Sequence, residues 1–234
     1  MADFEVAAKA SADAFARLAV ELHDAPGVEE TVDAVVQFAL QALNCTYAGI
    51  ALYASGSRPE IAAVTDPVVA DVYELQIDSE SGPLVTALRE RTTVLIRDTT
   101  TDGRWPQWAE RVAQLGVRSV LDVPLQTGGG GRPTVGVLGL YNPEPDAFSE
   151  DDEAIAHILA RHASVAVASA RHEETMAQAV DARKLVGQAM GILMERFDVD
   201  GDRAFAILKR YSQDTNTKLR DVAQQLIDTR RLPH

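Results

Sequence analysis

The side chains best suited to chemistry lie near the C-terminal end of the chain, around the stretch YSQDTNT at 211–217. Six of them offer hydroxyl or amide groups: Tyr211, Ser212, Gln213, Thr215, Asn216 and Thr217. The flanking positions are basic: Lys209, Arg210, Lys218 and Arg220. Such a mixture can stack on an unpaired base, donate to base edges and pair with phosphates, as RNA recognition requires. On composition alone, a solvated turn between two helices is slightly favoured.

Two glycines stand four residues apart in the apolar, helix-like stretch LVGQAMGILMERF at 185–197. Glycine inside a helix costs about 1 kcal/mol relative to alanine. Because positions four apart share one helix face, Gly187 and Gly191 predict a close approach by a neighbouring backbone. That neighbour is either another helix or RNA.

The patterns required for catalysis or metal binding are not evident in the sequence. The GGGG run at 128–131 lacks the Lys-Ser/Thr of a phosphate-binding loop, so it predicts a hairpin connection. The acidic run at 150–153 follows Ser149, which predicts a helix cap rather than a metal cluster. Cys45 is the single cysteine and predicts a buried small side chain. We expect no enzyme activity, no metal and no evident cofactor.

Charge divides the chain into two parts. The whole sequence has a formal net charge of −13. Residues 1–174 hold 12 basic and 27 acidic residues, whereas residues 175–234 hold 10 basic and 8 acidic ones. Only the second part is therefore suited to contact nucleic acid. With no signal-like N-terminus and no apolar run long enough to span a membrane, we expect a cytoplasmic protein.

Hydrophobic periodicity predicts mixed structure up to about residue 145. Helices are expected at 4–22, 28–43, 68–76, 83–91 and 105–115. Strands are expected at 47–53, 60–65, 93–96, 119–125 and 133–141. The order does not alternate as βαβ, so it predicts an α+β domain with an antiparallel sheet.

A long helix is expected from Ser149 to about residue 197, because no proline or turn cluster interrupts it. Apolar positions at alternating spacings of three and four form a partial heptad seam, including Ile158, Val165, Met176 and Leu193. The seam predicts a coiled-coil contact with a second copy in a homodimer. Further helices at 201–211 and 218–230 would complete an all-α bundle of three helices.

The stretches RSVLDVPL at 118–125 and PTVGVLGLYNPEPDAFSEDDEAIAHILARHASVAVASA at 133–170 resemble a GAF domain, over most of residues 28–172. The resemblance implies a sensor with a possible small-molecule pocket between the sheet and the short helices. The residues expected near it are Tyr53, Trp105, Trp108, Leu121 and Val123. A cyclic-nucleotide motif is incomplete: Asn142, Phe148, Asp152 and Glu153 match, but Pro143 replaces the lysine.

Residues 183–227 resemble the ANTAR domain of RNA-binding transcription antiterminators. The carriers are Ala189-x-Gly191-x-x-Met194, Ala204-Phe205-x-x-Leu208 and Leu219-x-x-Val222-Ala223. The resemblance implies binding to tandem stem-loops in leader transcripts. The residues expected to contact RNA are Arg183, Lys184, Gln188, Met190, Gly191, Lys209, Tyr211, Ser212, Thr215, Asn216, Lys218 and Arg220. Many relatives have lysine where this chain has Met190.

Together these observations predict a GAF-ANTAR regulator with four parts. They are an N-terminal helix at 1–27, a GAF core at 28–148, a connecting helix at 149–180 and an ANTAR domain at 181–230. The alternative is a helix-turn-helix DNA-binding regulator, with base-reading residues at the start of its third helix.

Overall fold

The computed structural model describes residues 2–54, 57–127 and 134–231, with side chains from residue 13 onward. The chain divides into two compact units, Met1–Arg171 and His172–His234, which we call unit 1 and unit 2. The predicted GGGG hairpin connection lies outside the described residues. Among the described residues, no helix combines the length and apolar character needed to cross a membrane.

Unit 1 is built on a five-stranded antiparallel sheet with the order β2-β1-β5-β4-β3. The strands are β1 (Tyr47–Leu52), β2 (Glu60–Val64), β3 (Val94–Ile96), β4 (Ser119–Gln126) and β5 (Thr134–Asn142). Strands β4 and β5 pair from Ser119 opposite Asn142 to Gln126 opposite Thr134. The prediction of an antiparallel α+β domain is confirmed.

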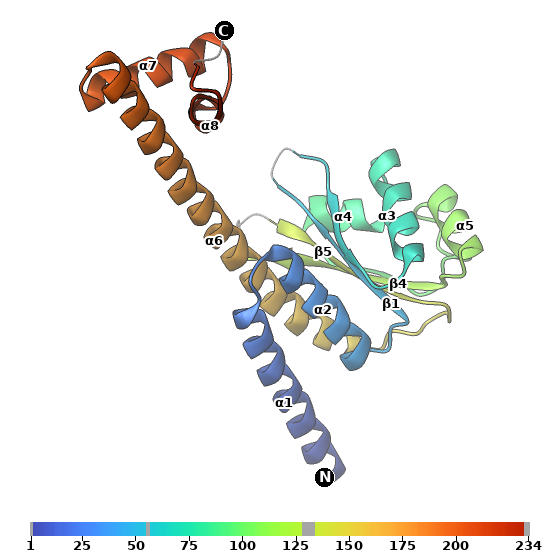
Figure 1. Ribbon diagram of the computed structural model, residues 1–234. Helices are drawn as coiled ribbons and strands as arrows, with labels where there is room; N and C mark the ends of the chain where they lie inside the picture. Colours follow the sequence, from blue (N-terminus) through green and yellow to red (C-terminus); the bar gives the residue numbers. More distant parts are fainter. Residues whose placement is uncertain (1, 55–56, 128–133, 232–234) are drawn as a thin grey trace. The chain divides into compact units, whose positions relative to one another are not determined.

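Helices cover both faces of this sheet (Figure 1). One face packs against α2 (Val28–Ala42) and the first half of α6 (Glu150–Phe197), with α1 (Ala2–Asp24) beside α2. The other face packs against α3 (Pro67–Ser79), α4 (Pro83–Glu90) and α5 (Pro106–Gln114). Successive strand residues point to opposite faces, so each face has its own core.

Helix α6 begins with the predicted cap. The Asp152 carboxylate accepts hydrogen bonds from the Ser149 backbone N at 2.9 Å and its hydroxyl at 2.6 Å. In return, the Asp152 backbone N donates to Ser149 Oγ at 3.2 Å. This reciprocal pair is a capping box, which satisfies donors at the start of the helix. The acidic run at 150–153 therefore has a structural explanation at Asp152.

The predicted seam along α6 lies in two different environments. Ile158, Val165 and Met176 are 46%, 66% and 55% exposed, and all residues from 172 to 181 are exposed. Farther along, Met190 is half-buried and Leu193 is fully buried in the core of unit 2. The seam is thus available to a partner only over its N-terminal and central part. The C-terminal part packs inside unit 2, so the partial seam predicted up to Leu193 is not free for a partner at that end.

Unit 2 is a bundle of the end of α6, α7 (Gly201–Asp214) and α8 (Leu219–Thr229). Helix α7 starts at the N-cap Asp200, whose carboxylate accepts from the Arg203 backbone N at 2.7 Å. The buried core of unit 2 contains seven apolar residues: Ala189, Leu193, Ala204, Leu208, Val222, Ala223 and Leu226. The three predicted helices are therefore present.

Candidate functional site

The turn between α7 and α8 is ordered by its own hydroxyl groups. Ser212 Oγ donates to the Thr217 carbonyl at 2.6 Å, and Thr215 Oγ1 donates to the Tyr211 carbonyl at 2.7 Å. Asn216 at the tip is exposed and adopts a positive φ of 50°. The Ser212 and Thr215 hydroxyls donate within the turn, so they can interact with a ligand mainly as hydrogen-bond acceptors. The Asn216 side-chain amide can both donate to a ligand and accept from it.

The basic side chains beside this turn differ in whether they form ion pairs. Arg210 lies 3.5 Å from Asp214, and Arg220 lies 3.1 Å from Asp221. Lys209 and Lys218 are exposed and have no ion pair among the described residues. The two lysines are therefore the positive charges on this surface that are best placed to pair with phosphate.

The other predicted RNA-binding residues lie on α6. Arg183, Lys184, Gln188 and Gly191 are exposed, and Lys184 pairs with Asp181 at 3.3 Å. Met190 is half-buried, with its terminal methyl 3.7 Å from where a Cβ would stand at Gly201. Among the described residues, no hydrogen bond or ion pair joins this α6 group to the α7–α8 turn.

The two helical glycines face open space. A Cβ added at Gly187 or Gly191 would meet nothing within 4 Å in the described part of the chain. No described helix of unit 2 comes close to them, so of the two expected neighbours a helix of the bundle is excluded, and RNA stays a prediction. Only an approach from another molecule can use the bare helix surface at these positions.

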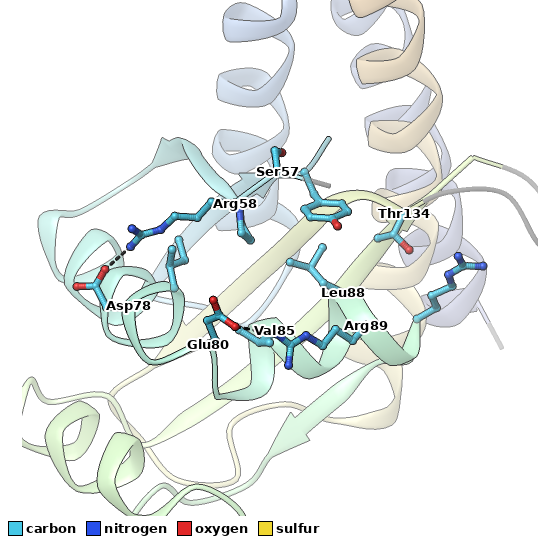
Figure 2. Close-up of a pocket in the computed structure, with 12 residues that line it drawn as sticks. Ser57, Arg58, Asp78, Glu80, Val85, Leu88, Arg89 and Thr134 are labelled. Carbon is cyan, nitrogen blue, oxygen red and sulfur yellow. Dashed lines mark hydrogen bonds and ion pairs between the residues drawn. The ribbon is translucent and has the colours of Figure 1, made fainter. Parts of the chain in front are cut away.

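The five residues predicted for the sensor pocket are not brought together. Tyr53 lines the cavity of Figure 2, whereas Trp105 and Trp108 line a separate cavity of 290 Å³ at the start of α5. Leu121 and Val123 are fully buried on the opposite face of the sheet, against α2 and α6. The prediction that Leu121 and Val123 lie near the pocket is therefore wrong. Because successive strand residues point to opposite faces, it is the residue between them on β4 that faces α3–α5.

The β4 residue between them, Asp122, points to the α3–α5 face and meets Tyr73 and Tyr141 there. A Cβ added at Gly139 would lie 2.4 Å from Tyr141 Oη and 2.6 Å from Tyr73 Oη. It would lie 2.9 Å from Asp122 Oδ1. The glycine therefore makes room for three oxygens that converge in the interior. Sequence reasoning missed this cluster, although an aspartate within the apolar run SVLDVPL was its signal.

These side chains are buried. The Tyr73 and Tyr141 hydroxyls interact with each other without reaching hydrogen-bond geometry, and neither Asp122 carboxyl oxygen has a partner among the described residues. Among the described residues, every buried side-chain polar atom that lacks a partner lies on this side of the sheet. They are Tyr73 Oη, Trp108 Nε1, both Asp122 carboxyl oxygens, Thr134 Oγ1 and Tyr141 Oη. Since such groups are rare in folded proteins, a concentration of them on one side indicates a functional layer.

Burial changes the ionisation of the cluster. It raises the pKa of the Asp122 carboxyl to about 8, because a carboxylate there would lose its hydration. Burial, with the neighbouring Asp122 carboxyl, raises the pKa of the Tyr73 phenol well above its ordinary value. Burial likewise raises the pKa of Tyr141, beside Tyr73 and Asp122. At neutral pH all three groups are protonated and carry a hydrogen to donate.

A cavity of 620 Å³ lies on the same side, where β1 ends and α3 and α4 approach each other (Figure 2). Apolar side chains such as Val85 and Leu88 form part of its wall. Arg58 pairs with Asp78 at its rim, and Arg89 lies 3.4 Å from Glu80. Its volume is in the range of small-molecule sites.

The residues of the incomplete cyclic-nucleotide motif have structural roles. The Asn142 side chain donates to the Asn44 carbonyl at 3.0 Å and accepts from the Glu144 backbone N at 2.9 Å. Phe148 is 3% exposed in the core of unit 1. Burial would raise the pKa of Asp152, but hydrogen bonds from Ser149 and Asn44 lower it below its ordinary value.

Two further observations concern the cysteine and the groups that could bind a metal ion. Burial, together with the charge of Asp152, raises the pKa of the Cys45 thiol to about 12, which suppresses the reactive thiolate. Among the described residues, no three His, Cys, Asp or Glu side chains gather as a metal ion would require.

Comparisons with known families identify both units. The GAF domain model matches residues 27–167, and the ANTAR domain model matches residues 174–227. The boundary between the two matches falls beside the division of the chain at Arg171 and His172. No curated protein sequence matches the chain.

Solved structures share the fold of unit 1 at low identity. The GAF domain of a phosphoenolpyruvate-protein phosphotransferase from Coxiella burnetii is 17% identical, with a TM-score of 0.54 over 70% of this chain and 95% of that one. The phytochrome photosensory core module of Stigmatella aurantiaca is 14% identical, with a TM-score of 0.57 over 86% of this chain and 44% of that one. The free methionine-R-sulfoxide reductase of Neisseria meningitidis is 16% identical, with a TM-score of 0.51 over 67% and 87%. At these identities the likeness shows the fold alone.

Proposed function

Since the chain belongs to the GAF domain family and continues into an ANTAR domain, we propose that it is a signal-responsive antiterminator that binds paired RNA hairpins. Its two domains are of regulatory kinds, a sensor followed by an RNA-binding antitermination module. The observation that carries the proposal is the ANTAR match at residues 174–227. Binding would hold stem-loops in a leader transcript and thereby prevent a terminator from forming.

The surface of unit 2 supports RNA as the partner. Lys209 and Lys218 offer positive charge that is not paired within the described residues, beside the exposed Asn216, and Tyr211 contributes an aromatic ring that is half-buried. Unpaired loop bases are recognised by this combination of charge, hydrogen bonding and stacking. The open helix surface at Gly191 allows the RNA backbone to come close to α6.

The exposed stripe of α6 supports pairing with a second copy. Ile158, Val165 and Met176 lie on one helix face, because their spacings of seven and eleven both return to nearly the same direction. Substituting Ile158→Glu together with Val165→Glu should produce monomers in sedimentation velocity. Val20→Glu is the matched control, since Val20 is 61% exposed on α1. An unchanged sedimentation coefficient in the double variant would contradict pairing through this stripe.

The sensing site is proposed for the layer between the sheet and α3–α5. There the cluster of Asp122, Tyr73 and Tyr141 offers hydrogen-bonding groups without partners, and the cavity of Figure 2 opens on the same side. A ligand that inserted there would satisfy buried polar groups, so its binding would raise the melting temperature of unit 1. A thermal-shift screen on wild type and Asp122→Asn would detect such a ligand. A hit that shifts both proteins equally would place the ligand elsewhere.

The RNA-binding proposal is tested by filter binding of the full chain to tandem hexaloop hairpins. We expect tight binding that is lost when the loop sequences are scrambled, because base contacts specify and phosphate contacts do not. Equal affinity for the scrambled loops would defeat the proposal. A duplex DNA competitor separates this proposal from the alternative of a helix-turn-helix DNA regulator. Duplex DNA would displace the hairpins from a DNA regulator, whereas an RNA-binding antiterminator would keep them bound.

A further inference from the structure

A second cavity of 620 Å³ lies beside the N-terminal part of α6; it shares Arg91 with the cavity of Figure 2, and its other lining residues are its own. Its walls come from residues 91–93, from the end of β4 and from the first turns of α6. The floor is the buried Ala160 and Ser164, which are 2% and 0% exposed. Most of the other lining groups are polar. We call this cavity the α6 groove.

Positive charge in the α6 groove is not neutralised by nearby carboxylates. Five arginines of unit 1 form ion pairs with a carboxylate within 4 Å. Arg91 and Arg161 have no ion pair among the described residues, and both line the α6 groove. One carboxylate, that of Glu153, shares the lining with them. The groove is therefore a local positive site in a strongly acidic unit.

Polar contacts hold the walls of the α6 groove in place. Gln126 Nε2 donates to the Arg91 carbonyl at 2.9 Å, which ties the end of β4 to the segment that carries Arg91. Thr93 Oγ1 lies 3.2 Å from His157 Nε2, which ties the same segment to α6. His157 also lies 3.8 Å from Glu153. Hydrogen-bond donors from three segments of the chain therefore line the α6 groove together.

We propose that the α6 groove binds a compact polyanion, the phosphate or diphosphate group of a small molecule. Guanidinium groups bind phosphate oxygens through paired N–H donors, and Arg91 and Arg161 offer two such forks from different elements. Thr93 adds a hydroxyl at the same wall. The cavity volume fits a small molecule rather than a single ion.

The position of the α6 groove gives the bound anion a route to unit 2. Arg161 and His157 belong to α6, the helix that continues to Phe197. Arg161 also follows the exposed Ile158 by three residues, next to the stripe proposed for pairing with a second copy. A bound anion therefore contacts the helix that carries unit 2.

The test is calorimetric titration of the full chain with inorganic pyrophosphate at constant ionic strength. Wild type should bind one pyrophosphate per chain. Arg91→Gln and Arg161→Gln should each weaken binding by about tenfold or more, since a hydrogen bond to a charged group is lost. Arg111→Gln is the matched control, because Arg111 is an exposed arginine of α5, on the other face of the sheet, and has no ion pair in the described part of the chain. It should bind as wild type does.

Three outcomes would overturn the proposal. They are no binding by wild type at millimolar pyrophosphate, equal weakening in Arg111→Gln, or equally tight binding of malonate, which would assign the groove to carboxylates. Thermal melts followed by circular dichroism establish that both groove variants fold. The probe contains no RNA, so this result stands apart from the test of RNA binding.

Discussion

Units 1 and 2 use their interiors differently. Among the described residues, all eight buried polar or charged residues lie in unit 1, whereas the buried core of unit 2 contains seven apolar side chains. Buried polar groups destabilise a fold unless they gain partners. Six of the eight form hydrogen bonds, whereas Asp122 and Thr134 have no partner among the described residues. These two residues therefore carry a cost in unit 1 that has no counterpart in the buried core of unit 2.

The largest effect that can test this contrast is the pH dependence of unit 1. Asp122 has a folded pKa of about 8 against an ordinary value of 3.8. Between these pH values the folded chain keeps a proton that the unfolded chain releases, so stability must fall as pH rises from about 4 to 8. The loss amounts to several kcal/mol, since each pKa unit corresponds to about 1.4 kcal/mol. Above pH 8 this contribution is flat.

Urea unfolding of Asp122→Asn across this pH range isolates the effect. Both tryptophans of the chain, Trp105 and Trp108, lie in unit 1, so their fluorescence reports that unit alone. The difference in unfolding free energy between the two proteins should rise steadily in favour of the variant from pH 5 to 8. Parallel curves would show that Asp122 ionises normally, and the contrast between the interiors would lose its main support.

A second test compares the two cores directly. Leu208→Ala in unit 2 and Leu121→Ala in unit 1 each remove a fully buried leucine and should each cost about 3 kcal/mol. Unit 2 is small, and a domain of its size has little stability to lose. Leu208→Ala should therefore unfold unit 2 at 37 °C while leaving the tryptophan emission of unit 1 native. Leu121→Ala should lower the melting temperature of unit 1 without unfolding it at 37 °C.

Circular dichroism at 222 nm reports the helices of both units, so where the tryptophan emission shows that unit 1 is native, a loss of this signal reports the unfolding of unit 2. A Leu208→Ala protein that keeps its full helix signal at 37 °C would show that unit 2 has more stability than its core indicates. A loss of native tryptophan emission in that variant would mean instead that the units unfold together.

A third test uses one glycine from each unit. Gly139→Ala places a methyl group 2.4 Å from Tyr141 Oη inside a packed layer, which should cost about 1–3 kcal/mol. Gly191→Ala places a methyl group in open space on a helix and should stabilise unit 2 by up to about 1 kcal/mol. Chemical unfolding of the two variants should thus give opposite signs. The same sign for both would contradict the difference in their surroundings.

The same contrast explains how much could be predicted from the sequence. Most elements were predictable, because periodicity and caps such as Ser149 with Asp152 act locally. Motif spacing also identified both families. The residues of the layer between the sheet and α3–α5 were not predictable, because Leu121 and Asp122 are neighbours on one strand and point to opposite faces. The sequence pattern does not say which of these faces meets α3. The open surroundings of Gly187 depend on where α7 and α8 pack, which no local spacing reveals.

The smallest expected effect concerns the surface of unit 2. If Lys209 and Lys218 each contact a phosphate, Lys209→Ala and Lys218→Ala should each weaken hairpin binding modestly, and by the same factor for the matched loops and for the residual binding of the scrambled ones. Each should also reduce the slope of log affinity against log salt by about 0.7, the value for one contact to single-stranded nucleic acid. Arg203→Ala is the control: Arg203 is exposed on α7, and its capping contact to Asp200 uses only the backbone. A slope unchanged in both lysine variants would move the RNA away from the α7–α8 turn. The α6 surface around Arg183 and Gly191 would then be the contact that remains.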